Sequence, residues 1–238
     1  MSKRTSDQIL HDAAQLHLPL VSDKELVRLY MLTDEVVRYR TKLLGLTASV
    51  DVHGPGAGIH GQEMGKRALE VAVCGDHTIL FVGPHGVGKT MLRCLGVALG
   101  HHASFEALPC PCGNYGDGRQ ECRCTAAKIE QVQRSWPECD ITLFLPSVPA
   151  REMLSELRGT TFQDMKARKE QCLERTKPTK LTEDATTFFK HAMSELGISA
   201  RAADAARRVA ATIACMDSDE WIGPSHIAEA VNYRRGAI

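Results

Sequence analysis

The chain has 238 residues and a mass of 26.1 kDa, which suits one large domain or two small ones and lets most apolar surface be buried. Its 29 Lys and Arg balance its 29 Asp and Glu, which excludes the strongly basic composition of proteins that hold nucleic acid by bulk charge. No apolar run reaches the length of a membrane span, and the first residues carry no secretory h-region. We therefore expect a cytoplasmic protein, without a membrane partner, whose nine cysteines stay reduced.

The first half of the chain begins with helical patterns and turns to a strand pattern. Residues 1–45 carry apolar positions at helical spacing, and the Gly-rich stretch 49–61 marks a loop or a boundary. A helix is predicted over residues 62–74. The apolar, β-branched run 78–82 is typical of a strand buried on both faces of a parallel sheet, and a glycine loop and a further helix follow it.

The second half contains one more convincing strand and then helices only. After Leu99 the pattern is poor until residues 141–145, which read as a second buried strand ended by Pro146. Helices are predicted at residues 150–157, 161–175, 182–196, 199–216 and 224–233, the last introduced by Pro224. An α/β fold with a helical C-terminal part is the expectation.

Residues 83–90 match the phosphate-binding loop pattern G-x-x-x-x-G-K-[ST], between a predicted strand and a predicted helix. Glycines there let backbone N–H groups point at phosphate oxygens, and the N-terminus of the next helix adds partial positive charge. The Lys89 ammonium suits the β- and γ-phosphates, and the Thr90 hydroxyl suits Mg²⁺. With ATP or ADP and Mg²⁺ as ligands, the predicted binding residues are Gly83, Gly86, Val87, Gly88, Lys89, Thr90 and Met91.

The carboxylate that P-loop ATPases need for metal and water has no obvious source in the sequence. It normally ends an apolar strand, as hhhhD or hhhhDE, and no such run is present. Asp140 precedes the strand 141–145 instead of ending one, so we interpret it as a residue at the start of that strand. Catalytic residues therefore stay unassigned, and ATP hydrolysis is left open.

Four of the nine cysteines lie within fifteen residues, as two C-x-C pairs around a Gly-rich turn. Thiolates of Cys110, Cys112, Cys122 and Cys124 could close a tetrahedral Zn²⁺ site. Because the usual spacing of zinc ligands is C-x₂-C, a reduced loop or a redox-sensitive thiol cluster is the alternative. The five scattered cysteines are interpreted mainly as core residues: Cys74, Cys94, Cys139, Cys172 and Cys215.

Several segments together resemble a known family over residues 57–238. The segments are 61–63, 66–72, 77–92, 109–124, 196–202, 208–214 and 226–234. They are similar to the AAA+ domain of the magnesium-chelatase I-subunit group, in particular its ComM (YifB) branch. The cysteine segment 109–124 is the more distinctive match.

The resemblance implies an AAA+ fold with a parallel P-loop sheet and a C-terminal helical lid. It also implies ATP and Mg²⁺ as ligands, ring-shaped oligomers of like or partner AAA+ subunits, and a motor role, which in the ComM branch acts on DNA. Arg201 matches the sensor-2 arginine, which reaches the γ-phosphate in this kind of protein. Gln62 and Ile59 fall where such proteins line the adenine pocket.

The chain departs from the family pattern in its middle, where it is internally shortened. Only about ten residues, 100–109, separate the P-loop helix from the cysteine signature, so the Walker B region is lacking. Leu108 stands at the sensor-1 asparagine, and Glu138 stands where an arginine finger belongs. In AAA+ proteins the strands of the sheet lie in the order 5-1-4-3-2. Loss of strands 2 and 3 leaves strands 5, 1 and 4 side by side, and these match residues 141–145, 78–82 and a weak run at 105–108, in that order. The new edge of the sheet would need covering by the N-terminal helices or by a partner.

The sequence thus predicts an α/β protein with a reduced P-loop AAA+ core. Residues 1–55 form an N-terminal helical segment, 56–149 the shortened nucleotide-binding core with its Cys-rich loop, and 150–238 the helical lid. The predicted function is binding of ATP or ADP with Mg²⁺, with weak or no hydrolysis by the chain alone. One alternative is an active motor ATPase on DNA within a ring that includes a partner. Another is a zinc-stabilised interaction module with a vestigial P-loop.

Overall fold

The computed structural model describes residues 59–117, 119–149 and 159–235, and the structural statements below refer to these. Contacts along the chain divide it into two units, Met1–Gly54 and Pro55–Ile238, and all described residues belong to the second. The helices predicted within 1–45 and at 150–157 lie outside the described residues.

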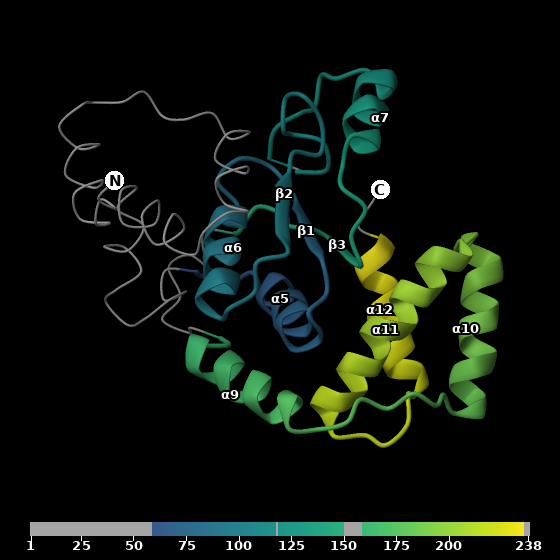
Figure 1. The fold of residues 1–238 in the computed structure, drawn as a ribbon. Helices are drawn as coiled ribbons and strands as arrows, with labels where there is room; N and C mark the ends of the chain where they lie inside the picture. The colour runs from purple at the N-terminus through teal and green to yellow at the C-terminus, as the bar shows by residue number, and fades with distance from the viewer. Residues whose placement is uncertain (1–58, 118, 150–158, 236–238) are drawn as a thin grey trace, which may run out of the picture. The chain divides into compact units, whose positions relative to one another are not determined.

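The second unit is a small parallel sheet with helices packed around it (Figure 1). In chain order its elements are α5 (Glu63–Gly75), β1 (Ile79–Val82), α6 (Lys89–Ala98), β2 (Ser104–Ala107), α7 (Ala126–Arg134), β3 (Ile141–Phe144), α9 (Phe162–Leu173), α10 (Glu183–Leu196), α11 (Ala200–Asp217) and α12 (Pro224–Arg235). In the described part of the chain, no helix is long and apolar enough to cross a lipid bilayer.

The sheet has the order β2-β1-β3, with both pairs parallel. The predicted contiguous order of the three strand segments is therefore confirmed, with the run around 78–82 at the centre. All four residues of β1 are buried, as predicted for a central strand. Phe81 pairs with Glu106 on β2 and with Leu143 on β3, and this register brings the ends of the three strands together.

The two faces of the sheet bury different sets of side chains because successive residues of a strand point to opposite sides. Ile79, Phe81 and Leu143 lie in the main core, which also contains residues of α5, α6, α11 and α12. Leu80 and Val82 point the other way, into a smaller cluster. α11 packs against α5, and α12 packs against β3, so the C-terminal helices contact the core directly.

The C-terminal helices begin where the sequence predicts. Thr161, Thr182 and Ser199 cap α9, α10 and α11, since each hydroxyl accepts a hydrogen bond from a backbone N–H of the first turn. Pro224 opens α12, where its missing N–H costs no intrahelical bond. These starts confirm the predicted helices at 161–175, 182–196, 199–216 and 224–233.

The sequence pattern missed α7, which no prediction placed between Leu99 and residue 141. α7 has only nine residues and buries none of them, so no core-facing stripe of several large apolar side chains marks it as a helix. Its residues are mostly good helix formers, and the helix forms on propensity without a packed stripe.

Replacing Phe81 by Ala should destabilise the protein by about 3 to 5 kcal/mol, because it empties a fully buried position at the centre of the sheet. Phe105→Ala on β2 is the matched control, since Phe105 is 41% exposed and should cost less than about 1 kcal/mol. Urea unfolding of both variants measures the difference. Equal losses at the two positions would contradict the central placement of β1.

Candidate functional site

The predicted phosphate-binding loop joins the end of β1 to the start of α6, at one end of the sheet. Its first residue, Gly83, donates a backbone hydrogen bond to Ala107 O at 3.3 Å. A Cβ on Gly83 would lie 2.5 Å from the backbone oxygen of Leu145, so this residue has to be glycine for β3 to pass. The loop therefore starts at a point that both neighbouring strands hold.

Gly86 and Gly88 give the loop its curvature. Their φ angles are +78° and +95°, a region that L side chains rarely adopt. A Cβ built on either residue would meet no described atom within 4 Å, so the backbone conformation, and not packing, demands glycine there. Gly88 is also the N-cap of α6 and has no side chain to cap the first turn.

Lys89 turns back over this loop. Its Nζ donates hydrogen bonds to Gly83 O at 2.7 Å and to Pro84 O at 2.5 Å, and the residue is buried. Burial lowers the pKa of Lys89, while the charge of Glu106 opposes that shift. The ammonium is thus held at the loop by neutral carbonyl oxygens.

Beside Lys89, the Thr90 side chain contacts Glu106, a residue that the sequence pattern did not single out. The Thr90 hydroxyl donates to Glu106 Oε2 at 2.8 Å, and Arg93 Nη1 donates to Glu106 Oε1 at 2.7 Å. Glu106 belongs to β2, whereas Thr90 and Arg93 belong to α6. Because Glu106 lies inside a weak strand pattern and does not end an apolar run, the Walker B pattern could not find it.

Gln62 lies against the loop, and its role in lining an adenine pocket stays a prediction. Its Nε2 donates to Val87 O at 3.1 Å and to Pro146 O at 2.8 Å. The side chain therefore ties the start of α5 to both the loop and the end of β3. Ile59 is buried in the main core, and Met91 packs on the same core.

Arg201 is not brought to the loop. Its guanidinium pairs with Glu138 at 2.7 Å, and both side chains are largely exposed, so the pair adds little stability. Glu138 precedes β3, whereas the loop follows β1, and in a parallel sheet these points lie at opposite ends. A nucleotide-binding role for Arg201 stays a prediction.

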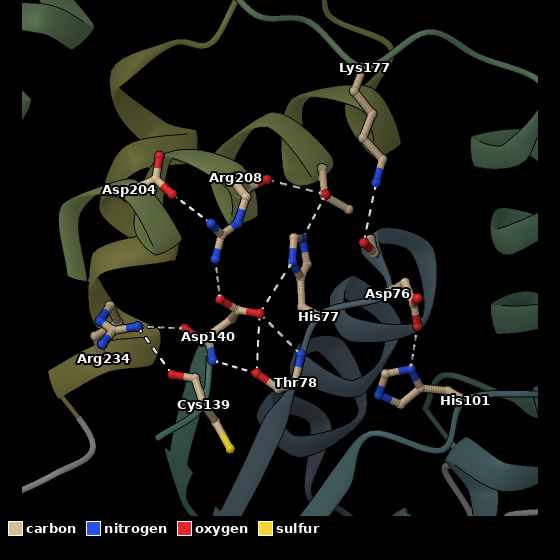
Figure 2. A network of polar contacts seen from close by, with 12 residues as sticks. Asp76, His77, Thr78, His101, Cys139, Asp140, Lys177, Asp204, Arg208 and Arg234 are labelled. Atoms are coloured by element: carbon tan, nitrogen blue, oxygen red, sulfur yellow. Dashed lines mark hydrogen bonds and ion pairs between the residues drawn. The ribbon is translucent and has the colours of Figure 1, made fainter. Parts of the chain in front are cut away.

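Asp140 joins a polar network at that opposite end of the sheet (Figure 2). It directly precedes β3, in agreement with its interpretation as the start of a strand. Its Oδ2 accepts hydrogen bonds from the backbone and hydroxyl of Thr78, and its Oδ1 accepts from Arg208 at 2.6 Å. Although burial opposes the shift, the bonds from Arg208 and Thr78 lower the pKa of Asp140. The carboxylate is fully occupied in joining β1, β3 and α11.

His77 belongs to the same network and lines a cavity of about 480 Å³ with Asp140, Lys177, Arg207 and Arg208. Its Nε2 lies 2.8 Å from the Thr212 hydroxyl, and its Nδ1 lies 4.0 Å from Asp140 Oδ2. Burial lowers the pKa of His77 to about 4, against the opposing charge of Asp140. The imidazole is therefore neutral at physiological pH.

The four predicted cysteines form the second candidate site. Their sulfur atoms all lie within 4.8 Å of one another, and Cys110 lies 3.4 Å from Cys112 and 3.7 Å from Cys122. Four thiolates around one Zn²⁺ at 2.3 Å stand about 3.8 Å apart, so the spacing fits a tetrahedral metal. The pKa of Cys112 is lowered to about 6, first by the backbone of Asn114 and then by the Cys110 thiol.

The cysteine turn also touches the phosphate-binding loop. A Cβ on Gly113, which follows Cys112, would lie 3.1 Å from the His85 ring. His85 lies in the loop between β1 and α6. The cysteine turn therefore lies next to the phosphate-binding loop.

A buried parallel strand, a glycine loop and a helix that starts with Lys and Thr define a P-loop α/β protein. Two family models match this chain: magnesium chelatase, subunit ChlI, over residues 57–108, and magnesium chelatase, subunit ChlI C-terminal, over residues 149–234. The chain belongs to the ComM/ChlI family of AAA+ proteins.

Curated relatives match over short segments. The chain is 48% identical over 46 residues to YifB of Salmonella typhimurium, covering 19% of this chain and 8% of that protein. It is 59% identical over 32 residues to YifB of Escherichia coli, covering 13% and 6%. It is 59% identical over 34 residues to the competence protein ComM of Haemophilus influenzae, covering 14% and 7%. The matched segments thus span less than a tenth of each of these relatives.

Stability should fall as the pH drops from about 6.5 to about 4, because His77 protonates in the unfolded chain before it does so in the folded one. Its contribution is complete above the ordinary pKa of 6.5 and is lost toward a pKa of about 4, by roughly 1.4 kcal/mol per pH unit. Asp140, Lys177, Arg208 and His101 are the charged or titratable groups that influence it.

Urea unfolding of the wild type and of His77→Gln across this pH range measures the effect. The variant keeps a hydrogen-bonding side chain for Thr212 but cannot titrate, so its stability should depend less steeply on pH. Parallel curves for the two proteins would show that His77 does not carry the dependence.

Proposed function

We propose that this chain binds ATP or ADP together with Mg²⁺ through residues 83–90. The observation that carries the proposal is the glycine loop itself: Gly86 and Gly88 have positive φ, and no described atom lies within 4 Å of where a Cβ on either would be. Such a loop at a helix N-terminus presents backbone N–H groups to phosphate oxygens. The residues present therefore fit a phosphate group with its metal.

Each side chain at the loop has a separate task in this proposal. Phosphate oxygens are stronger acceptors than the two carbonyls that Lys89 now contacts, so its ammonium is expected to turn to them. The Thr90 hydroxyl offers the hard oxygen ligand that Mg²⁺ prefers. The bound cation neutralises charge on the phosphates. Gln62 holds Val87 and Pro146 and so keeps the loop against the end of β3.

We further propose that hydrolysis by the chain alone is weak or absent. The sequence has Leu108 at the sensor-1 position and Glu138 at the arginine-finger position. Arg201 pairs with Glu138 at the end of the sheet away from the loop. The alternative, which the resemblance to the ComM branch implies, is a motor ATPase acting on DNA in a ring with a partner. ATPase activity stimulated by a complete homologue would favour that alternative.

A second proposal concerns the cysteine site, where we propose a structural Zn²⁺. The separations of 3.4 and 3.7 Å between sulfurs match those around one tetrahedral metal ion. The described residues between β2 and α7 form no strand or helix, so a metal would supply the stability that regular structure does not. Through Gly113 and His85, the same metal would steady the phosphate-binding loop.

Calorimetric titration with ADP and ATP in the presence of Mg²⁺ tests the nucleotide proposal. Lys89→Ala should weaken binding about 10- to 100-fold, because it removes a charged donor to the phosphates. Lys128→Ala is the matched control, since Lys128 is exposed on α7 and its loss should leave the affinity unchanged.

Wild-type protein that binds neither nucleotide would contradict this proposal. If such a protein still held one zinc per chain, it would be an interaction module with a vestigial P-loop. ATP turnover well above that of Lys89→Ala would contradict only the proposal of weak hydrolysis.

The purified protein should contain about one zinc per chain, and removing it with a chelator should lower the midpoint of thermal unfolding. Cys112→Ser should lose the metal, because it deletes one of four ligands at an exposed position where packing changes little. Cys94→Ser, outside the cluster, should keep it. Metal analysis that finds no zinc in the wild type, or equal zinc in Cys112→Ser, would refute the site.

A further inference from the structure

Glu106 occupies an unusual position for a charged residue in this sheet. It lies on β2, directly opposite Phe81 of the buried central strand. Because side chains alternate along a strand, Glu106 shares its face of β2 with Ser104. That face turns to α6, since a Cβ on Gly96 would lie 3.4 Å from Ser104 Oγ. The carboxylate therefore points into the layer between β2 and the helix that follows the phosphate-binding loop.

The two oxygens of the carboxylate have different partners. Oε1 accepts a hydrogen bond from Arg93 at 2.7 Å, and Oε2 accepts one from the Thr90 hydroxyl at 2.8 Å. The side chains of Arg93 and Glu106 are each 24% exposed, so the pair is largely shielded from solvent. Arg93 thus fixes the carboxylate, and the fixed carboxylate sets the direction of the Thr90 O–H bond.

The geometry points to Glu106 as the carboxylate that orients the Thr90 hydroxyl for Mg²⁺, an inference that rests on the proposed nucleotide site. In complete P-loop ATPases an Asp at the end of another strand holds the metal together with the loop Ser or Thr. A hydroxyl has one proton and two lone pairs. With its proton committed to Glu106, the oxygen of Thr90 presents only lone pairs elsewhere, which is what a cation requires.

Glu106 also brings negative charge to the metal side of the loop. Its charge opposes the effect of burial on the pKa of Lys89, which indicates that the two groups influence each other electrically. A negative charge at this place favours a bound cation and disfavours bare phosphates. Removing the charge should therefore weaken the binding of ADP with Mg²⁺ and leave its binding without Mg²⁺ equal or stronger, a difference that loss of a structural ion pair would not produce.

The test is calorimetric titration of ADP into wild type and Glu106→Gln, once with Mg²⁺ and once with EDTA. The variant keeps the shape of the side chain and loses its charge. We expect affinity for ADP with Mg²⁺ to fall about 10-fold or more, as when a group supporting a metal ligand is removed. Affinity for ADP in EDTA should stay equal or rise. Mn²⁺ in place of Mg²⁺ gives a second readout, because its electron paramagnetic resonance spectrum reports the bound metal directly.

Two further variants sharpen the result. Glu130→Gln is the matched control, since Glu130 forms an exposed pair with Arg134 at 2.6 Å on α7 and should change neither affinity. Thr90→Val should lose the Mg²⁺ effect as Glu106→Gln does. The double variant should lose no more than either single one, because both changes remove the same interaction.

The outcomes separate this inference from the function on which it rests. If Glu106→Gln weakens ADP equally with and without Mg²⁺, or weakens neither, Glu106 has only a structural role and the inference is wrong, while nucleotide binding stands. If wild type binds ADP under neither condition, the proposed function fails and the inference fails with it. Should Glu106→Gln unfold, Glu106→Asp provides the same comparison with the charge kept and the reach shortened: weaker binding only with Mg²⁺ supports the inference, and an unchanged Mg²⁺ effect overturns it.

Discussion

The hydrogen bonds at the C-terminal end of β1 are the constraint on which the site depends. Gly83 N donates to Ala107 O at 3.3 Å, and Leu145 N donates to Val82 O at 2.7 Å, so β2 and β3 hold the strand up to the first residue of the loop. A side chain at position 83 would strike the Leu145 carbonyl. In the described residues the sheet has three strands, and the strand that carries the loop is the buried central one. A sheet of three strands thus supplies the support that a phosphate-binding loop needs.

The two ends of this sheet carry different chemistry. At the end of β1, Lys89, Thr90 and Glu106 surround a loop whose glycines leave open space. At the start of the strands, Asp140 and His77 are saturated with contacts to Thr78, Arg208 and Thr212, so that end joins the sheet to α11. Backbone donors of a glycine loop at a helix N-terminus suit a phosphate ligand, whereas side chains that bond to one another across separate elements suit a structural joint. This contrast is why the nucleotide is proposed at the loop and not in the cavity beside His77.

How far the sequence predicts this structure depends on whether a local pattern carries the information. β1 and β3 are apolar runs, the loop is a fixed motif, and α9 to α12 begin at hydroxyl caps or proline, so each was predictable from neighbouring residues. α7 has only nine residues and buries none of them, so no long core-facing stripe marks it in the sequence. The role inferred for Glu106 rests on the pairing of β2 with β1, and the place of Arg201 rests on the packing of α11 against α5. Such contacts join residues that are far apart in the chain, so no local spacing of residues in the sequence predicts them.

Hydrogen–deuterium exchange of the backbone amides, with and without saturating ADP and Mg²⁺, tests the central claim most directly because it reports where a ligand binds. The account predicts that protection is concentrated in residues 84–91, where amides of the loop and the first turn of α6 would meet phosphate oxygens. It also predicts that Lys89→Ala abolishes this protection at the same ligand concentration. Unchanged exchange in that segment, or protection confined to the residues around the cavity at His77, would contradict it.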